Sequence, residues 1–232
     1  MKSHIEKHIK IGNYLKDIIF AANDGIVTTF AVVAGVVGAS LSHEIILIIG
    51  FASLFADAFS MATGNYLGTK TEQDFYNKES AEEAKEIEET PENELNEVRE
   101  ILRNKGYVGA DVERMTELIS SNKTYWRDFM LHEEIGIISP EKGSAFKNGL
   151  VTFISFLMAG SIILIPYIFL NGDYAFQISI LVGIITLFSV GALRKFFSDR
   201  SWFVSGLEML IVGGSAAILA YLIGSFLGGI IG

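Results

Sequence analysis

Five apolar segments constrain the fold of this 232-residue chain more strongly than any other feature. A helix needs roughly 20 mostly apolar residues to cross the hydrocarbon core of a bilayer. Helices of this length that are apolar all round have little reason to exist in water, so a soluble protein with five core helices is the weaker alternative. The sequence therefore predicts an all-α membrane protein with five transmembrane helices. The segments cover approximately residues 18–40, 45–67, 149–170, 174–193 and 203–231.

The stretch between the second and third segments has a different composition. Residues 68–147 contain 19 Asp and Glu against 11 Lys and Arg, which is −8 of the chain's formal charge of −9. We expect three parts: residues 1–67 with the first two spans, an acidic helical metal-binding domain at 68–147, and residues 148–232 with the last three spans. There is no cysteine, which excludes disulfides and thiolate metal sites.

Proline and glycine divide the acidic stretch into helices. A polar helix is expected to continue from the second span to residue 90, and a second to start at Pro91 with Thr90 as its N-cap and to stop at Gly106. A third is predicted over 110–121, capped by Asp111 or a neighbour. A fourth is predicted over 123–136, ending near Gly136.

Basic residues predict the orientation in the membrane. Lys and Arg are concentrated before the first span and between the fourth and fifth, whereas the 41–44 and 171–173 loops have none. Basic loops favour the cytosolic side. The N-terminus and the acidic domain are therefore expected in the cytosol, and the short loops favour a prokaryotic cell membrane. The basic residues are Lys2, Lys7, Lys10, Lys16, Arg194, Lys195 and Arg200.

Pairs of potential ligands recur in the acidic domain. Residues three or four apart share one side of a helix, so three helices could direct five carboxylates and one thioether towards a common volume. Such closely packed carboxylates repel unless protons or cations lie between them. For any single Glu, a solvated surface role is the simpler interpretation, and Glu82 or Glu133 could replace a neighbour. The candidate metal ligands are Glu83, Glu86, Glu94, Glu97, Met130 and Glu134.

Ionisable groups also occur within the predicted spans, where they are rare and usually functional. Asp24 lies in the first span, and Asp57 and Met61 lie one turn apart in the second. A carboxylate with a thioether favours a borderline transition metal over Ca²⁺ or Mg²⁺. Met61 alone would be explained by packing. These three residues are the candidate transport pathway, and the sequence has no nucleotide-binding fingerprint to power it.

Several of these motifs resemble one family. Residues 24–35 (DGIVTTFAVVAG) are similar to the opening helix of the vacuolar iron transporter family, and residues 60–67 (SMATGNYL) resemble its second-helix signature. Residues 129–136 (FMLHEEIG) resemble its third metal-binding segment, with Met130 and Glu134 at the ligand positions. The resemblance covers essentially the whole chain.

The resemblance implies a homodimer that exports Fe²⁺, and often Mn²⁺, from the cytosol in exchange for protons. It also implies a pore at the dimer interface lined by Asp24 and Met61, fed by the cytosolic glutamates. No enzymatic activity, organic cofactor or nucleic-acid partner is expected. Co²⁺ and Zn²⁺ remain alternative ions. The alternative function is a membrane-anchored iron-binding or ferroxidase-like protein without transport.

The chain departs from the family pattern in its second span. Family members commonly carry a Glu two turns before the second-helix Met, where this chain has Ser53. Asp57 stands one turn before Met61 instead. We hypothesise that Asp57 supplies the carboxylate that Ser53 lacks.

Overall fold

The computed structural model describes residues 2–139, 144–170, 173–197 and 199–231, and all of its regular structure is helical. The expected all-α class is thus confirmed for the described residues. The chain forms two compact units. The first, the membrane unit, contains residues 1–66 and 145–232; the second, the acidic unit, contains residues 67–144.

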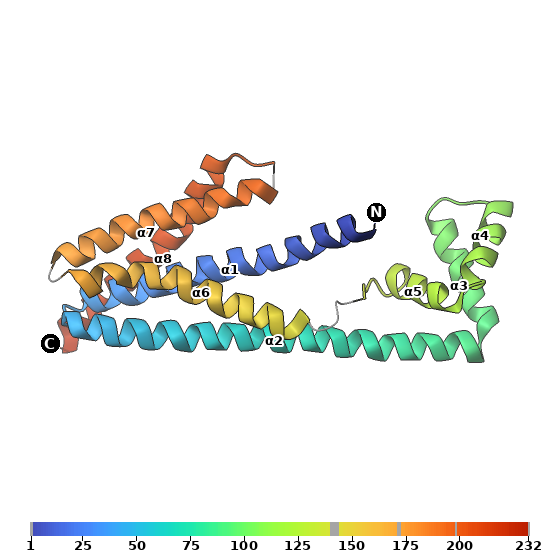
Figure 1. Cartoon of the computed structure of the whole chain (residues 1–232), viewed down its shortest axis with the longest axis horizontal. Helices are drawn as coiled ribbons and strands as arrows, with labels where there is room; N and C mark the ends of the chain where they lie inside the picture. The colour runs from blue at the N-terminus through green and yellow to red at the C-terminus, as the bar shows by residue number, and fades with distance from the viewer. Residues whose placement is uncertain (1, 140–143, 171–172, 198, 232) are drawn as a thin grey trace. The chain divides into compact units, whose positions relative to one another are not determined.

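Within the described residues, the membrane unit holds five helices that are long and apolar enough to cross a bilayer, as predicted. They are α1 (Lys2–Gly38), the first part of α2 (His43–Glu89), α6 (Ser144–Phe169), α7 (Asp173–Leu193) and α8 (Trp202–Ile231). A short 3₁₀ helix, η1 (Arg194–Phe197), follows α7. Figure 1 labels α1, α2, α6, α7 and α8.

Helix α2 belongs to both units because it continues without a break far beyond its apolar part (Figure 1). At 1.5 Å per residue, its 47 residues extend about 70 Å, more than twice the thickness of a bilayer's hydrocarbon core. Its polar second half therefore lies outside the membrane-spanning segment. The predicted polar helix up to residue 90 is this continuation.

Close helix contacts in the membrane unit depend on glycine. A Cβ at Gly25 would lie 2.5 Å from the Phe156 carbonyl oxygen, so α1 and α6 meet backbone to backbone there. Gly224 and Gly228 approach the end of α1 in the same way. The glycine pair of α8 thus serves packing within the chain, whereas Gly64 on α2 has open space beside it.

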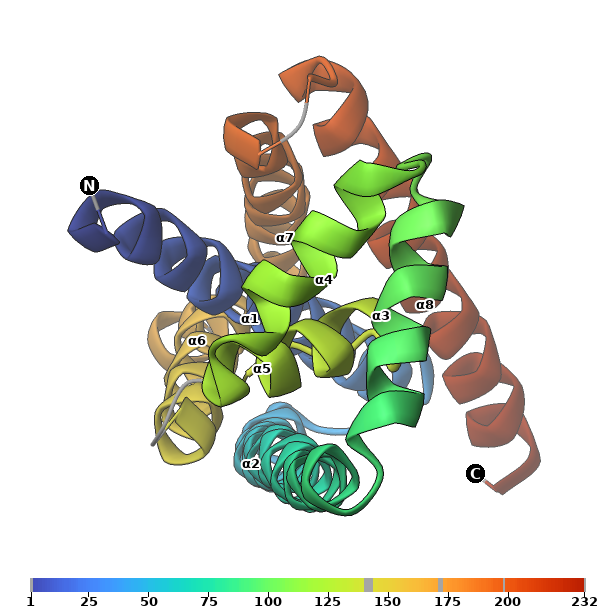
Figure 2. The ribbon, with the colours of Figure 1, turned by 90° about the vertical axis from the view of Figure 1, so that its right-hand side faces the viewer.

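The acidic unit adds three short helices to the end of α2: α3 (Pro91–Asn104), α4 (Ala110–Ser120) and α5 (Lys123–Glu133). Helix α4 packs against both α3 and α5, as Figure 2 shows. Their apolar faces form one small core, made of Ile87, Val98, Leu102, Val112, Ile119, Trp126 and Met130. This core fixes which sides of α2 and α3 remain for polar groups.

The helix ends confirm part of the predicted capping. Gly106 has a φ of 95°, the left-handed conformation expected after a helix. Thr90 is at the N-cap of α3, but its hydroxyl donates to the Glu86 carbonyl instead of capping. Asp111 was the wrong choice for α4, since Gly109 is the N-cap there. Asn122, which was not predicted, caps α5 by accepting from two backbone amides.

Candidate metal-binding groups in the acidic unit and the membrane unit

The acidic unit brings together the carboxylates that the sequence pairs along its helices. Glu83 and Glu86 lie on the last turns of α2, and Glu94 and Glu97 lie on the first turns of α3. Glu134 is the C-cap residue of α5. Because Pro91 ends one helix and starts the next, α2 and α3 join through a single residue, which keeps the two pairs near each other.

These five carboxylates influence one another electrostatically. Burial, followed by the charges of Glu94 and Glu134, raises the pKa of Glu83 to about 8. Burial and the charge of Glu97 raise the pKa of Glu94, and burial with Glu97 and Glu86 raises that of Glu134. Glu83 therefore holds a proton at neutral pH that an ordinary carboxylate would have released.

Exposure is graded across the cluster. Glu83 and Glu94 are only 3% and 5% exposed, and each has one carboxylate oxygen without a hydrogen-bond partner. Glu97 is half-buried, whereas Glu86 and Glu134 are exposed. A buried acceptor without a partner is costly, and a proton or a bound cation relieves that cost. The cluster thus has an outer edge open to ions and an inner pair that favours receiving positive charge.

Glu82 and Glu133, the two alternatives to neighbouring cluster members, form ion pairs outside the cluster. Glu82 pairs with Lys78, and Glu133 pairs with Lys105 and His132. The hydrogen bond from Lys105 lowers the pKa of Glu133, the opposite direction from Glu134. Glu133 is therefore a fixed anion in an ion pair, and the repelling cluster contains Glu83 and Glu134.

The cluster is not arranged as a preformed metal site in the described residues. Met130 is fully buried and belongs to the apolar core of the acidic unit, so packing already accounts for its position. Among the described residues, no three His, Cys, Asp or Glu side chains are arranged so that they could hold a metal ion as they stand. Metal binding here requires the carboxylates to close around the ion, which their mutual repulsion otherwise opposes.

The membrane unit places the acidic side chains predicted within its first two spans within electrostatic range of each other. Asp24 on α1 interacts with Asp57 on α2, and both are half-buried. The Ser53 hydroxyl donates a 2.9 Å hydrogen bond to Oδ2 of Asp57. Met61, one turn further along α2, is half-buried and packs against the core of the membrane unit. The first two spans thus carry a pair of carboxylates at one level of the unit.

Ser53 was considered in the sequence only as the position where family members carry Glu. Its hydrogen bond to Asp57 was not predicted. Its spacing of four residues from Asp57 was the available signal, because residues i and i+4 are neighbours on a helix. The ion pair of Arg99 with Glu113, at 3.0 Å, links α3 to α4 and was also not predicted. No local pattern reveals that pair, since the two residues are far apart in sequence.

Known proteins resemble this chain over nearly its full length. The family model described as the VIT family matches residues 15–225. The vacuolar iron transporter of Plasmodium berghei (strain Anka) is 34% identical over 237 residues, covering 98% of this chain and 87% of the relative. That of Toxoplasma gondii (strain ATCC 50861 / VEG) is 35% identical, covering 99% and 80%. Vacuolar iron transporter 1 of Arabidopsis thaliana is 32% identical, covering 94% and 88%. With five candidate membrane spans and a family match that covers most of its length, the chain is an integral membrane protein of the VIT family.

Proposed function

We propose that this protein is a proton-coupled exporter that moves Fe²⁺, and with it Mn²⁺, out of the cytosol. Transport of iron is supported by the names of its relatives, which are vacuolar iron transporters. The observation that carries the proposal is the pairing of two groups of carboxylates: the repelling cluster of the acidic unit, and Asp24 with Asp57 among helices that are otherwise apolar.

In this proposal the cluster collects the ion. A divalent cation that enters at the exposed Glu86 and Glu134 and reaches the buried pair displaces the proton of Glu83. Carboxylate oxygens suit Fe²⁺ and Mn²⁺, and Met130 would add a thioether if it turned from the core. The released protons make binding pH-dependent, with weaker binding at lower pH.

The membrane-spanning part then conducts the ion between two copies of the chain. Asp24, Asp57 and Met61 would line a pore at a homodimer interface, with the open side of α2 at Gly64 available for close approach. The acidic unit and the N-terminus would face the cytosol, as the basic loops predict. Binding and release of protons at Asp24 and Asp57 would couple the movement of the metal ion out of the cytosol to the movement of protons into it.

Flux through proteoliposomes distinguishes this function from its alternative, a membrane-anchored iron-binding or ferroxidase-like protein. With a pH gradient imposed across the membrane, we expect Fe²⁺ uptake that the Asp24→Ala variant lacks. Metal binding without flux would contradict the proposal and favour the alternative. Oxygen consumption with Fe²⁺ in the absence of flux would point to oxidase activity.

A further inference from the structure

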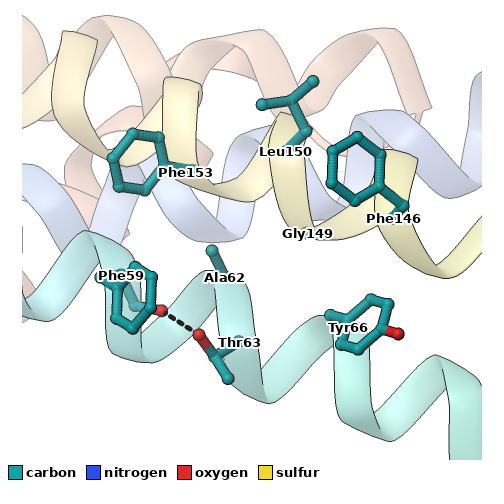
Figure 3. A pocket seen from close by; sticks show the side chains of 8 residues that line it. All are labelled: Phe59, Ala62, Thr63, Tyr66, Phe146, Gly149, Leu150 and Phe153. Atoms are coloured by element: carbon teal, nitrogen blue, oxygen red, sulfur yellow. Dashed lines mark hydrogen bonds between the residues drawn. The ribbon is translucent and has the colours of Figure 1, made fainter.

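An apolar groove of about 470 Å³ runs along the surface of the membrane unit between α2 and α6. Figure 3 shows its two walls facing each other, with Phe59 opposite Phe153 at one end and Tyr66 opposite Phe146 at the other. Ala62 and Thr63 from α2, and Gly149 and Leu150 from α6, complete the lining.

The groove arises because small residues at its floor are flanked by aromatic ones. A Cβ on Gly149 would lie 2.9 Å from the Ala62 carbonyl oxygen, so the two helices are in close contact there. The Thr63 hydroxyl donates to the Phe59 carbonyl at 2.8 Å, which satisfies its hydrogen bond within the helix. The walls stand out from this floor: Phe59 is 68% exposed and Phe146 is 71% exposed.

The position of the groove indicates contact with lipid. It lies within two membrane-spanning helices, and the rise along α2 from Phe59 to Tyr66 is about 10 Å, most of the roughly 15 Å hydrocarbon thickness of one leaflet. Phe59 follows Asp57 by two residues, which places the two side chains on opposite sides of α2. The groove therefore faces away from the intramembrane carboxylates.

Charge at one end specifies the kind of lipid. Lys147 is exposed and is the only Lys, Arg, Asp or Glu in α6. It lies three residues before Leu150, so the two are neighbours on the helix surface. It also follows Phe146 directly in the sequence, and Phe146 lines the end of the groove opposite Tyr66. A long lysine side chain at the end of a span extends towards the headgroup region, where it attracts anionic lipids.

We propose that this groove is a binding site for one acyl chain of an anionic phospholipid, whose phosphate headgroup pairs with Lys147. The chain lies between the aromatic walls and covers apolar surface that the two helices leave open. The site is separate from the ion pathway and does not depend on the proposed transport.

Photoactivatable phosphatidylglycerol, carrying a diazirine in its acyl chain, tests the site in nanodiscs containing the full-length protein. We expect labelling concentrated in residues 59–66 and 146–153, above that of the exposed apolar face of α8. Leu150→Trp fills the groove and should remove this excess. Ile154→Trp, at a similarly exposed position one turn away, is the matched control and should keep it.

Two substitutions of exposed lysines test the contact between the lipid headgroup and Lys147. Lys147→Gln should weaken the preference for phosphatidylglycerol over phosphatidylcholine about fivefold, the effect of one lysine near an anionic surface. Lys195→Gln, an exposed lysine after α7, should leave the preference unchanged. Three results would each overturn the proposal. Residues 59–66 and 146–153 could be labelled no more than the exposed face of α8, or phosphatidylglycerol and phosphatidylcholine could label them equally. Cross-links between the grooves of two copies would show that a second copy of the chain occupies the groove.

Discussion

Replacing Glu83 by Gln should stabilise the metal-free acidic unit at neutral and alkaline pH. The pKa of Glu83 is raised from 4.5 to about 8 in the folded unit, mainly by burial and by Glu94. The folded state therefore binds more protons than the unfolded state between these values, so stability is complete below pH 4.5 and falls as pH rises towards 8. Gln has nearly the same shape and cannot ionise, which removes this contribution.

The size of the effect follows from the shift. A rise of about 3.5 pKa units corresponds to about 5 kcal/mol above pH 8, at 1.36 kcal/mol per unit. Water at the exposed members of the cluster screens part of this repulsion. We therefore expect Glu83→Gln to raise the free energy of unfolding by about 2 kcal/mol at pH 8.5 and by almost nothing at pH 4.5.

Urea unfolding with a chelator present measures this difference. Trp126 is in the core of the acidic unit, so its fluorescence reports the unit's unfolding once Trp202 is changed to Phe. Glu82→Gln is the control, because Glu82 is exposed and pairs with Lys78 outside the cluster. Equal pH dependence in the wild type and in Glu83→Gln would refute the assigned electrostatics.

Three further substitutions test separate parts of the account. Asp57→Asn should reduce flux and its pH dependence, and Ser53→Ala should do so more weakly by removing one hydrogen bond to the Asp57 carboxylate; unchanged flux and pH profile in Asp57→Asn would exclude a role for that carboxylate. Met130→Leu keeps the apolar volume and should cost less than about 1.5 kcal/mol, so a lower affinity for Fe²⁺ in binding titrations would identify the thioether as a ligand and unchanged affinity would assign Met130 to packing alone. Gly25→Ala places a methyl group 2.5 Å from a backbone oxygen of α6 and should lower the thermal midpoint, whereas Gly214→Ala, on α8 with nothing within 4 Å of the added methyl group, should not; equal midpoints would contradict the close packing.

Much of the fold was predictable because its signals are local. Apolar length identified all five candidate spans, and Pro91 and Gly106 marked where helices begin and end. The cap of α4 was not predictable in the same way, since Asp111 has the right chemistry but the chain turns at Gly109. Capping depends on backbone conformation as well as on residue type.

The candidate site, like the fold, was predictable only where its signals are local in the sequence. Spacing along helices predicted that Glu83 lies near Glu86 and Glu94 near Glu97, and these residues influence one another electrostatically. Spacing could not decide between Glu133 and Glu134 as the member of this cluster. That choice depends on Lys105, which lies on another helix and forms an ion pair with Glu133. Tertiary contacts of this kind, including the burial that shifts the pKa of Glu83, have no counterpart in a local pattern.

Initial rates of Fe²⁺ flux against Fe²⁺ concentration test the central claim most directly, with wild type, Asp24→Ala and the Glu83→Gln/Glu94→Gln double variant compared in proteoliposomes. The account predicts that Asp24→Ala abolishes flux at every concentration, because the intramembrane carboxylate lies on the path. It predicts that the double variant keeps the maximal rate and needs more Fe²⁺ to reach half of it, because only collection is impaired. Wild-type flux in Asp24→Ala, or an unchanged half-saturating concentration in the double variant, would contradict it.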